Sequence, residues 1–284
     1  MSKTVVVAMS TSGLDYYPFD HDIRILRLKV ILGDKTYVDS PEFIDNDRFV
    51  SWVRENPDKL PKSSPPSRLE ITKFFLGLQD EGFEDILFIA MSSALSKTYQ
   101  QVIDMIPLLQ NKVRVHVFNS RTGTFTEGLM ALEADKCLKQ GMSVEETLHR
   151  LEDMRRDSHV MFGVDDLTYM VKNGRLSFTS HFFANLFKIK PLINVDRDGK
   201  AVVAEKIMTT TRTMYAISDR IRAITATRDY YVFTLYSGNM ELHKQLVDIL
   251  AERNNLSGLP AYPISPVVTA HAGISGFGVG LLPL

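Results

Sequence analysis

The sequence predicts a two-domain α/β protein, with a parallel-sheet domain at residues 1–158 and a mixed α/β domain at residues 159–284. Three observations support this prediction. The 284 residues are enough for about two typical domains. In the first half, short apolar runs alternate with helical patterns, which is typical of parallel strands covered on both faces. Near residue 157 the pattern changes to a mixed series of short strands and helices.

The first domain is expected to contain three parallel strands, which are apolar runs at Val5–Met9, Ile86–Met91 and Val113–Phe118. Two helices begin at capping boxes, because Ser67 is followed three residues later by Glu70, and Ser143 by Glu146. A further amphipathic helix runs through Leu129–Leu138. These alternating elements favour a βαβ arrangement with a parallel sheet.

Two segments interrupt this alternation. Residues 22–40, with a turn at Gly33 and Asp34, predict an inserted β-hairpin. Residues 55–67 contain four of the twelve prolines, which predicts a stiff loop. The second domain is expected to have helices at 165–172, 178–187, 213–223 and 240–253, and strands at 189–195, 201–208, 230–235, 261–268 and 277–282.

The composition argues against several classes of protein. With 33 Lys and Arg against 34 Asp and Glu, the chain lacks the basic field of a nucleic-acid binder. No apolar run approaches the roughly 20 residues of a membrane helix, and the run after Lys3 is too short for a signal peptide. Cys137 is the only cysteine, so an internal disulfide and a four-cysteine zinc site are excluded. We expect a cytoplasmic protein without stable membrane insertion.

Hydroxyl side chains follow the predicted strands, where parallel sheets bind ligands. They occur at Ser10–Ser12, at Ser92–Ser96 and at Asn119–Thr124, and the Pro-rich loop adds Ser63 and Ser64. Together with helix N-terminal amides, such groups suit a small anion such as a carboxylate or phosphate. The near absence of carboxylates at these ends argues against magnesium-dependent phosphoryl transfer. The alternative interpretation is structural, because Ser, Thr and Asn are also the usual helix caps.

Catalytic motifs are weak in this sequence. The segment Gly273–Gly278 fits neither a nucleophile elbow nor a dinucleotide fingerprint, because it precedes a predicted strand. His149 and His243 fall in amphipathic helices and are interpreted as structural. His271 lies between a predicted strand and a Gly-rich turn, which makes it the histidine to consider for a site.

Several blocks in one order resemble the DegV family of bacterial fatty-acid-binding proteins: SerSerProProSer at 63–67, SerSerAlaLeuSer at 92–96, AsnSerArg at 119–121, ValLysAsnGlyArgLeuSer at 171–177, PheLysIleLysProLeuIle at 187–193 with AspGly at 198–199, and ThrAlaHisAlaGly at 269–273. The resemblance covers nearly the whole chain. It implies a lipid tunnel between the two domains and no catalysis or cofactor of its own. It also implies a long-chain fatty acid as ligand and the ATP-binding subunit of a fatty acid kinase as partner.

The resemblance also implies which residues bind the ligand. Ser93 is expected to hydrogen-bond the carboxylate directly, His271 to donate to the head group, and Arg175 to lie near the site or at the kinase-facing surface. The apolar segment Phe178–Phe187 is expected to form a tunnel wall. The full set of expected ligand-binding residues is Ser63, Ser64, Ser92, Ser93, Arg175, His271 and Gly273.

The chain departs from the family pattern at Met9, Lys97, Asn119, Met208 and Ile274. These positions change the rim of the expected site, so kinase docking has less support than lipid binding. Two alternatives remain. One is a lipid hydrolase with Ser93 as nucleophile and His271 as base, which lacks an obvious third residue. The other is a regulatory lipid sensor without a kinase partner.

Overall fold

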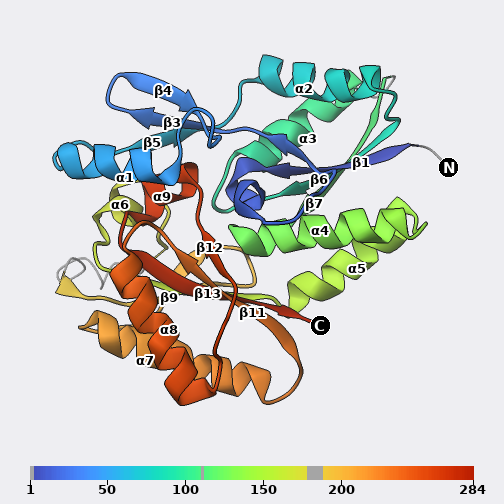
Figure 1. Ribbon diagram of the computed structural model, residues 1–284. Helices are drawn as coiled ribbons and strands as arrows, with labels where there is room; N and C mark the ends of the chain where they lie inside the picture. Colours follow the sequence, from blue (N-terminus) through green and yellow to red (C-terminus); the bar gives the residue numbers. More distant parts are fainter. Residues whose placement is uncertain (1–2, 110–111, 178–187) are drawn as a thin grey trace.

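The structure is a computed structural model that describes residues 3–109, 112–177 and 188–284. The two larger of the three sheets alternate with layers of helices (Figure 1). Helices α2 (Arg68–Asp80) and α3 (Thr98–Leu109) cover the outer face of the first sheet. Helices α4 (Phe125–Lys139) and α5 (Val144–Arg156) lie between the sheets. This arrangement confirms the predicted α/β class.

The first sheet is entirely parallel, in the order β2-β1-β6-β7. Strands β1 (Thr4–Met9), β6 (Asp85–Ala90) and β7 (Arg114–Asn119) confirm the three predicted strands to within a residue or two. Strand β6 is buried along its whole length, because helices cover both faces of the sheet. The capping boxes at Ser67 and Ser143 are both formed, at the starts of α2 and α5.

The inserted segment forms a small antiparallel sheet, in the order β4-β3-β5. Strands β3 (Lys29–Leu32) and β4 (Lys35–Val38) form the predicted hairpin. Its predicted start was wrong, because β2 (Arg24–Leu26) pairs in parallel with β1 instead. The Pro-rich segment is not all loop either, because β5 (Lys62–Ser64) pairs with β3. Helix α1 (Asn46–Glu55), which was not predicted, lies between β4 and β5 in the chain.

The second sheet is mixed, in the order β10-β9-β8-β13-β11-β12, as the prediction of a mixed domain requires. Helices α7 (Thr210–Thr225) and α8 (Met240–Asn254) cover its outer face (Figure 1). Strand β8 was not predicted. The strands are β8 (His159–Val164), β9 (Leu192–Val195), β10 (Ala201–Glu205), β11 (Tyr230–Tyr236), β12 (Ala261–Pro263) and β13 (Gly276–Pro283).

The strand predicted over 261–268 was wrong beyond Pro263, because Pro266–Ala272 forms helix α9. Proline at the first helical position is preorganised for a helix. The Asp39 carboxylate accepts a hydrogen bond from the Val267 amide at 3.3 Å, which satisfies one free donor of the helix start. Tertiary contacts therefore override the strand preference of a Val-rich run.

Two other predicted helices need comment. Only α6 (Thr168–Lys172) forms within the helix predicted at 165–172. The helix predicted at Phe178–Phe187, and its role as a tunnel wall, lie outside the described residues.

An aromatic cluster joins the two halves of the chain. The Phe125 ring, in α4, stacks on Tyr262 with ring centroids 3.6 Å apart and meets Phe233 edge-on at 5.4 Å. Both sheets therefore pack on α4, and their relative position is fixed by shared core. The two sheets come from chain segments on either side of residue 158, while the domain boundary at that residue stays a prediction.

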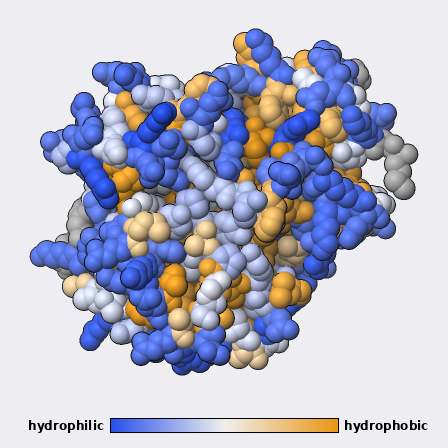
Figure 2. All heavy atoms as spheres, viewed as in Figure 1, coloured by the Kyte–Doolittle hydropathy of each residue, from blue (hydrophilic) through white to orange (hydrophobic). Residues whose placement is uncertain are grey.

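Figure 2 shows a mostly hydrophilic face on which apolar residues gather in a few patches. Within the described ranges, no helix is both long and apolar enough to cross a bilayer.

Candidate ligand-binding site

A cavity lies between the carboxyl ends of the first sheet's strands and the second sheet. It encloses about 1130 Å³, its open mouth included. The segments that follow the strands of the first sheet, the strands of the second sheet and α9 contribute lining residues, which makes the cavity a product of the packed fold.

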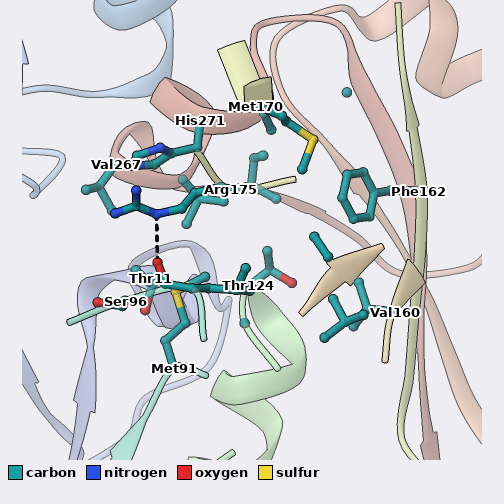
Figure 3. A pocket seen from close by; sticks show the side chains of 18 of the residues that line it. Thr11, Met91, Ser96, Thr124, Val160, Phe162, Met170, Arg175, Val267 and His271 are labelled. Atoms are coloured by element: carbon teal, nitrogen blue, oxygen red, sulfur yellow. Dashed lines mark hydrogen bonds between the residues drawn. The ribbon is translucent and has the colours of Figure 1, made fainter. Parts of the chain in front are cut away.

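One end of the cavity is apolar. Val160 and Phe162 from β8 project into it on the side away from His271, and Met170 from α6 also lines the cavity (Figure 3). Leu235 from β11 and Phe277 from β13 add to the same lining. Such a surface binds hydrocarbon by removing apolar area from water.

The other end is polar and is built around Ser63 and His271. The two residues are 208 positions apart, yet Ser63 Oγ and His271 Nε2 lie 2.7 Å from each other. Pairing of β5 with β3 sets the position of Ser63, opposite Val30. The Asn173 amide donates to the carbonyls of Ala270, at 2.9 Å, and Pro61, at 3.4 Å, and so ties α9 to the chain before β5.

The His271 imidazole is neutral at physiological pH. Burial, and next the nearby Arg175 guanidinium, lower its pKa to about 4. A neutral imidazole carries one proton, and which nitrogen holds it is set by the hydrogen bond at the other. Within the described part of the chain, buried Nδ1 has no hydrogen-bond partner. If the Ser63 hydroxyl donates to Nε2, Nδ1 carries the proton and can donate a hydrogen bond to a ligand oxygen.

Arg175 also lines the polar end (Figure 3). Its Nε donates to the Leu95 carbonyl at 2.9 Å and its Nη1 to the Asn173 carbonyl at 2.6 Å. Burial lowers its pKa, yet guanidinium stays charged at neutral pH. The residue therefore holds the loop after β6 in place and adds positive potential, so the polar end suits an anion.

Comparison with known proteins identifies the relatives of this chain. Residues 3–284 match the model of the DegV family, described as uncharacterised proteins. The chain belongs to the DegV family. It is 30% identical to a DegV domain-containing protein of Staphylococcus aureus, over 98% of this chain and 96% of the relative.

Solved DegV structures share the fold. A fatty acid binding DegV family protein from Streptococcus agalactiae has a TM-score of 0.91 at 22% identity, covering 100% of both chains. A fatty acid binding DegV family protein from Thermus thermophilus has a TM-score of 0.86 at 26% identity, covering 99% of this chain and 100% of that one. The fatty acid kinase B3 protein of Streptococcus pneumoniae, loaded with linoleic acid, has a TM-score of 0.80 at 18% identity, covering 100% of each chain.

Of the seven expected ligand-binding residues, Ser63, Arg175 and His271 line the cavity of this DegV protein, and the other four do not. Ser92 is buried behind the wall, where its hydroxyl donates to the Gly199 carbonyl at 2.7 Å. Ser93 is exposed, and the Asn119 amide donates to its hydroxyl at 2.8 Å. Its role as direct carboxylate donor stays a prediction.

Ser64 and Gly273 adjoin lining residues without lining the cavity themselves. Side chains alternate along a strand, so Ser64 points away from the face that Ser63 presents. Gly273 ends α9 with φ +78°, and a Cβ there would lie 2.8 Å from the Tyr169 ring. Glycine is required at this position by its backbone and by close packing.

Four polar residues line the cavity of this DegV protein but were absent from the expected set: Thr11, Ser96, Lys97 and Thr124. All belong to the segments that follow strands β1, β6 and β7, so the clusters of hydroxyl residues at the strand ends were the right signal. Sequence pattern could not tell which hydroxyl of each cluster faces the cavity.

Proposed function

We propose that this DegV protein binds a long-chain fatty acid, with its carboxylate beside Ser63, His271 and Arg175 and its tail along the apolar end. The observation that carries the proposal is the partnerless Nδ1 of a neutral, buried His271 at the polar end of an otherwise apolar cavity. A carboxylate supplies the acceptor that this nitrogen lacks. The fatty acid binding named for the Thermus and Streptococcus relatives supports the same ligand class.

The two ends of the ligand contribute differently to binding. Each buried methylene is worth about 0.8 kcal/mol, so a chain of about 14 methylenes contributes up to roughly 11 kcal/mol before the costs of association. A hydrogen bond to the charged carboxylate adds about 1.5–3 kcal/mol. The tail therefore supplies most of the affinity, and the polar end fixes which way the ligand points.

We further propose that the bound carboxylate is presented to the ATP-binding subunit of a fatty acid kinase, which forms the acyl phosphate. The shared fold of the fatty acid kinase B3 protein supports this role. Lys97 lines the cavity and is exposed, and in this proposal its ammonium group attracts the phosphate donor. In this proposal the DegV chain binds and orients the substrate, and the partner supplies the catalysis.

The hydrolase alternative has less support. His271 Nε2 bonds Ser63 and not Ser93, and Nδ1 has no carboxylate partner among the described residues. A serine hydrolase orients its histidine through such an acid. The same ranges contain no group of three metal-ligating side chains that would activate water instead.

The test is to extract the purified protein and identify its lipid by mass spectrometry, then to measure uptake of hexadecanoic acid by the delipidated protein. We expect a fatty acid in the extract and saturable uptake of one molecule per chain. An empty extract together with no uptake would refute fatty acid binding.

The catalytic roles are tested separately. Addition of ATP and a fatty acid kinase ATP-binding subunit should yield acyl phosphate, which hydroxylamine traps as a hydroxamate. Binding without trapped product would favour the lipid sensor, while turnover of a chromogenic ester that Ser63→Ala or Ser93→Ala abolishes would favour the hydrolase.

A further inference from the structure

Two polar side-chain atoms at the cavity lack a hydrogen-bond partner, while a plain fatty acid has one polar group. Among the described lining residues, two buried side-chain atoms have no hydrogen-bond partner: His271 Nδ1 and Thr124 Oγ1. The carboxylate of the proposed ligand would pair with His271 Nδ1. Thr124 Oγ1 would then face hydrocarbon, and burying an unpaired hydroxyl against hydrocarbon is unfavourable.

The backbone holds the Thr124 hydroxyl away from the partner that it would normally have. Thr124 is the N-cap of α4, where a threonine hydroxyl usually accepts a hydrogen bond from the helix start, yet no such bond is formed. Its φ of +59° is a rare conformation for a β-branched residue. Strained residues of this kind cluster at ligand-binding sites. Thr124 therefore forms no hydrogen bond to the start of α4, and its side chain lines the cavity instead.

Thr124 lies apart from the polar end. Figure 3 shows it on the wall opposite His271 and Arg175, toward Val160. A ligand anchored by its carboxylate at His271 would therefore pass Thr124 with its chain.

Neighbouring threonines show that this feature is specific. Thr11 also lines the cavity, but its hydroxyl donates to Glu127 Oε2 at 2.8 Å. Glu127 is fully buried, and burial raises its pKa well above the usual range. Thr126 Oγ1 is buried and partnerless like that of Thr124, but Thr126 does not line the cavity. Of these three, Thr124 alone combines a partnerless hydroxyl with a place on the lining.

We infer that the cavity selects fatty acids that carry a hydroxyl group on the acyl chain, and that this group hydrogen-bonds Thr124. The inference rests on the proposed function, with the carboxylate at His271. A hydroxyl both donates and accepts, so it pairs with a threonine hydroxyl in either direction. A site that hydrogen-bonds a substrate hydroxyl discriminates against the analogue that lacks it, whereas apolar walls do not.

The test compares delipidated wild type with variants, using hexadecanoic acid and a series of hexadecanoic acids with one hydroxyl at successive carbons. We expect one or a few positional isomers to bind about tenfold more tightly than the parent acid, the upper end of what one neutral hydrogen bond provides. Thr124→Val, which keeps the shape and removes the hydroxyl, should abolish this preference without weakening binding of the parent acid. Thr124→Ser should retain the preference, and the matched control Thr126→Val should leave it unchanged.

Three results would overturn the inference. Wild type could bind no hydroxylated isomer more tightly than the parent acid, or Thr126→Val could act like Thr124→Val. Alternatively, Thr124→Val could weaken the parent acid as much as the isomers, which would place the carboxylate at Thr124. Each of these leaves fatty acid binding intact, whereas failure to bind any acid would refute the proposed function itself, and the inference with it.

Discussion

Ser63 and His271 should act as one unit in binding the carboxylate, and a double-mutant cycle tests this. Their side chains are 2.7 Å apart, and the proposed donor, Nδ1, depends on the Ser63 hydroxyl donating to Nε2, which leaves the ring proton on Nδ1. His271→Ala removes a hydrogen bond to a charged group, worth about 1.5–3 kcal/mol, so the Kd for hexadecanoic acid should rise about 10- to 150-fold. Ser63→Ala removes the group that fixes the tautomer and should cost a large part of the same energy.

Because both substitutions disrupt the same donor, the double variant should be little worse than His271→Ala alone. We expect a coupling energy of about 1–2 kcal/mol, well above the roughly 0.5 kcal/mol deviation of independent sites. Kd values would come from competition with a fluorescent fatty acid, with urea unfolding to confirm that each variant folds. Ser64→Ala is the matched control, because Ser64 is adjacent on β5 but does not line the cavity. Additive single effects, or an equal loss in Ser64→Ala, would refute the reasoning.

The remaining predictions concern stability. Gly280→Ala should destabilise the protein by about 1–3 kcal/mol in urea unfolding, because the new Cβ would lie 2.1 Å from the Phe233 ring. Gly77→Ala has open space around it in α2 and should instead stabilise the protein by about 0.5–1 kcal/mol; destabilisation there would contradict the packing argument. Burial raises the pKa of Asp39 to about 7, so the titration of Asp39 lowers the stability of the folded protein as pH rises from about 4 to 7. Burial lowers the pKa of His271 to about 4, so the titration of His271 lowers that stability as pH falls from about 6.5 to 4. Relative to wild type, Asp39→Asn should therefore gain stability with rising pH and His271→Gln with falling pH, each by up to about 3–4 kcal/mol across its window. Parallel stability curves for wild type and variant would contradict either assignment.

Local sequence was informative where an element depends on its own residues. The capping boxes at Ser67 and Ser143 marked two helix starts correctly, because both partners lie within one turn. The continuous apolar run of β6 marked a strand buried on both faces. His243 was interpreted as structural, and its Nε2 lies 2.9 Å from the Thr234 hydroxyl within the core.

Local sequence failed where a distant partner decides the conformation. Residues 62–64 form a strand because β3 offers an edge to pair with, although the surrounding prolines predict a loop. Val267 lies in a helix because Asp39, 228 residues away, binds its amide. Neither β3 nor Asp39 lies within a dozen residues of the segment whose conformation it decides.

The sequence by itself determined the α/β class, the strand ends rich in hydroxyl groups and the family resemblance, because each depends on residue types in chain order. Only the tertiary structure decided which of these groups meet. It brought Ser63 to His271, left Ser92 behind the wall and Ser93 in solvent, and turned Thr124 to the cavity. The physical reason is that facing a cavity depends on backbone geometry and on how the sheets pack around α4, and a list of neighbouring residue types does not specify either.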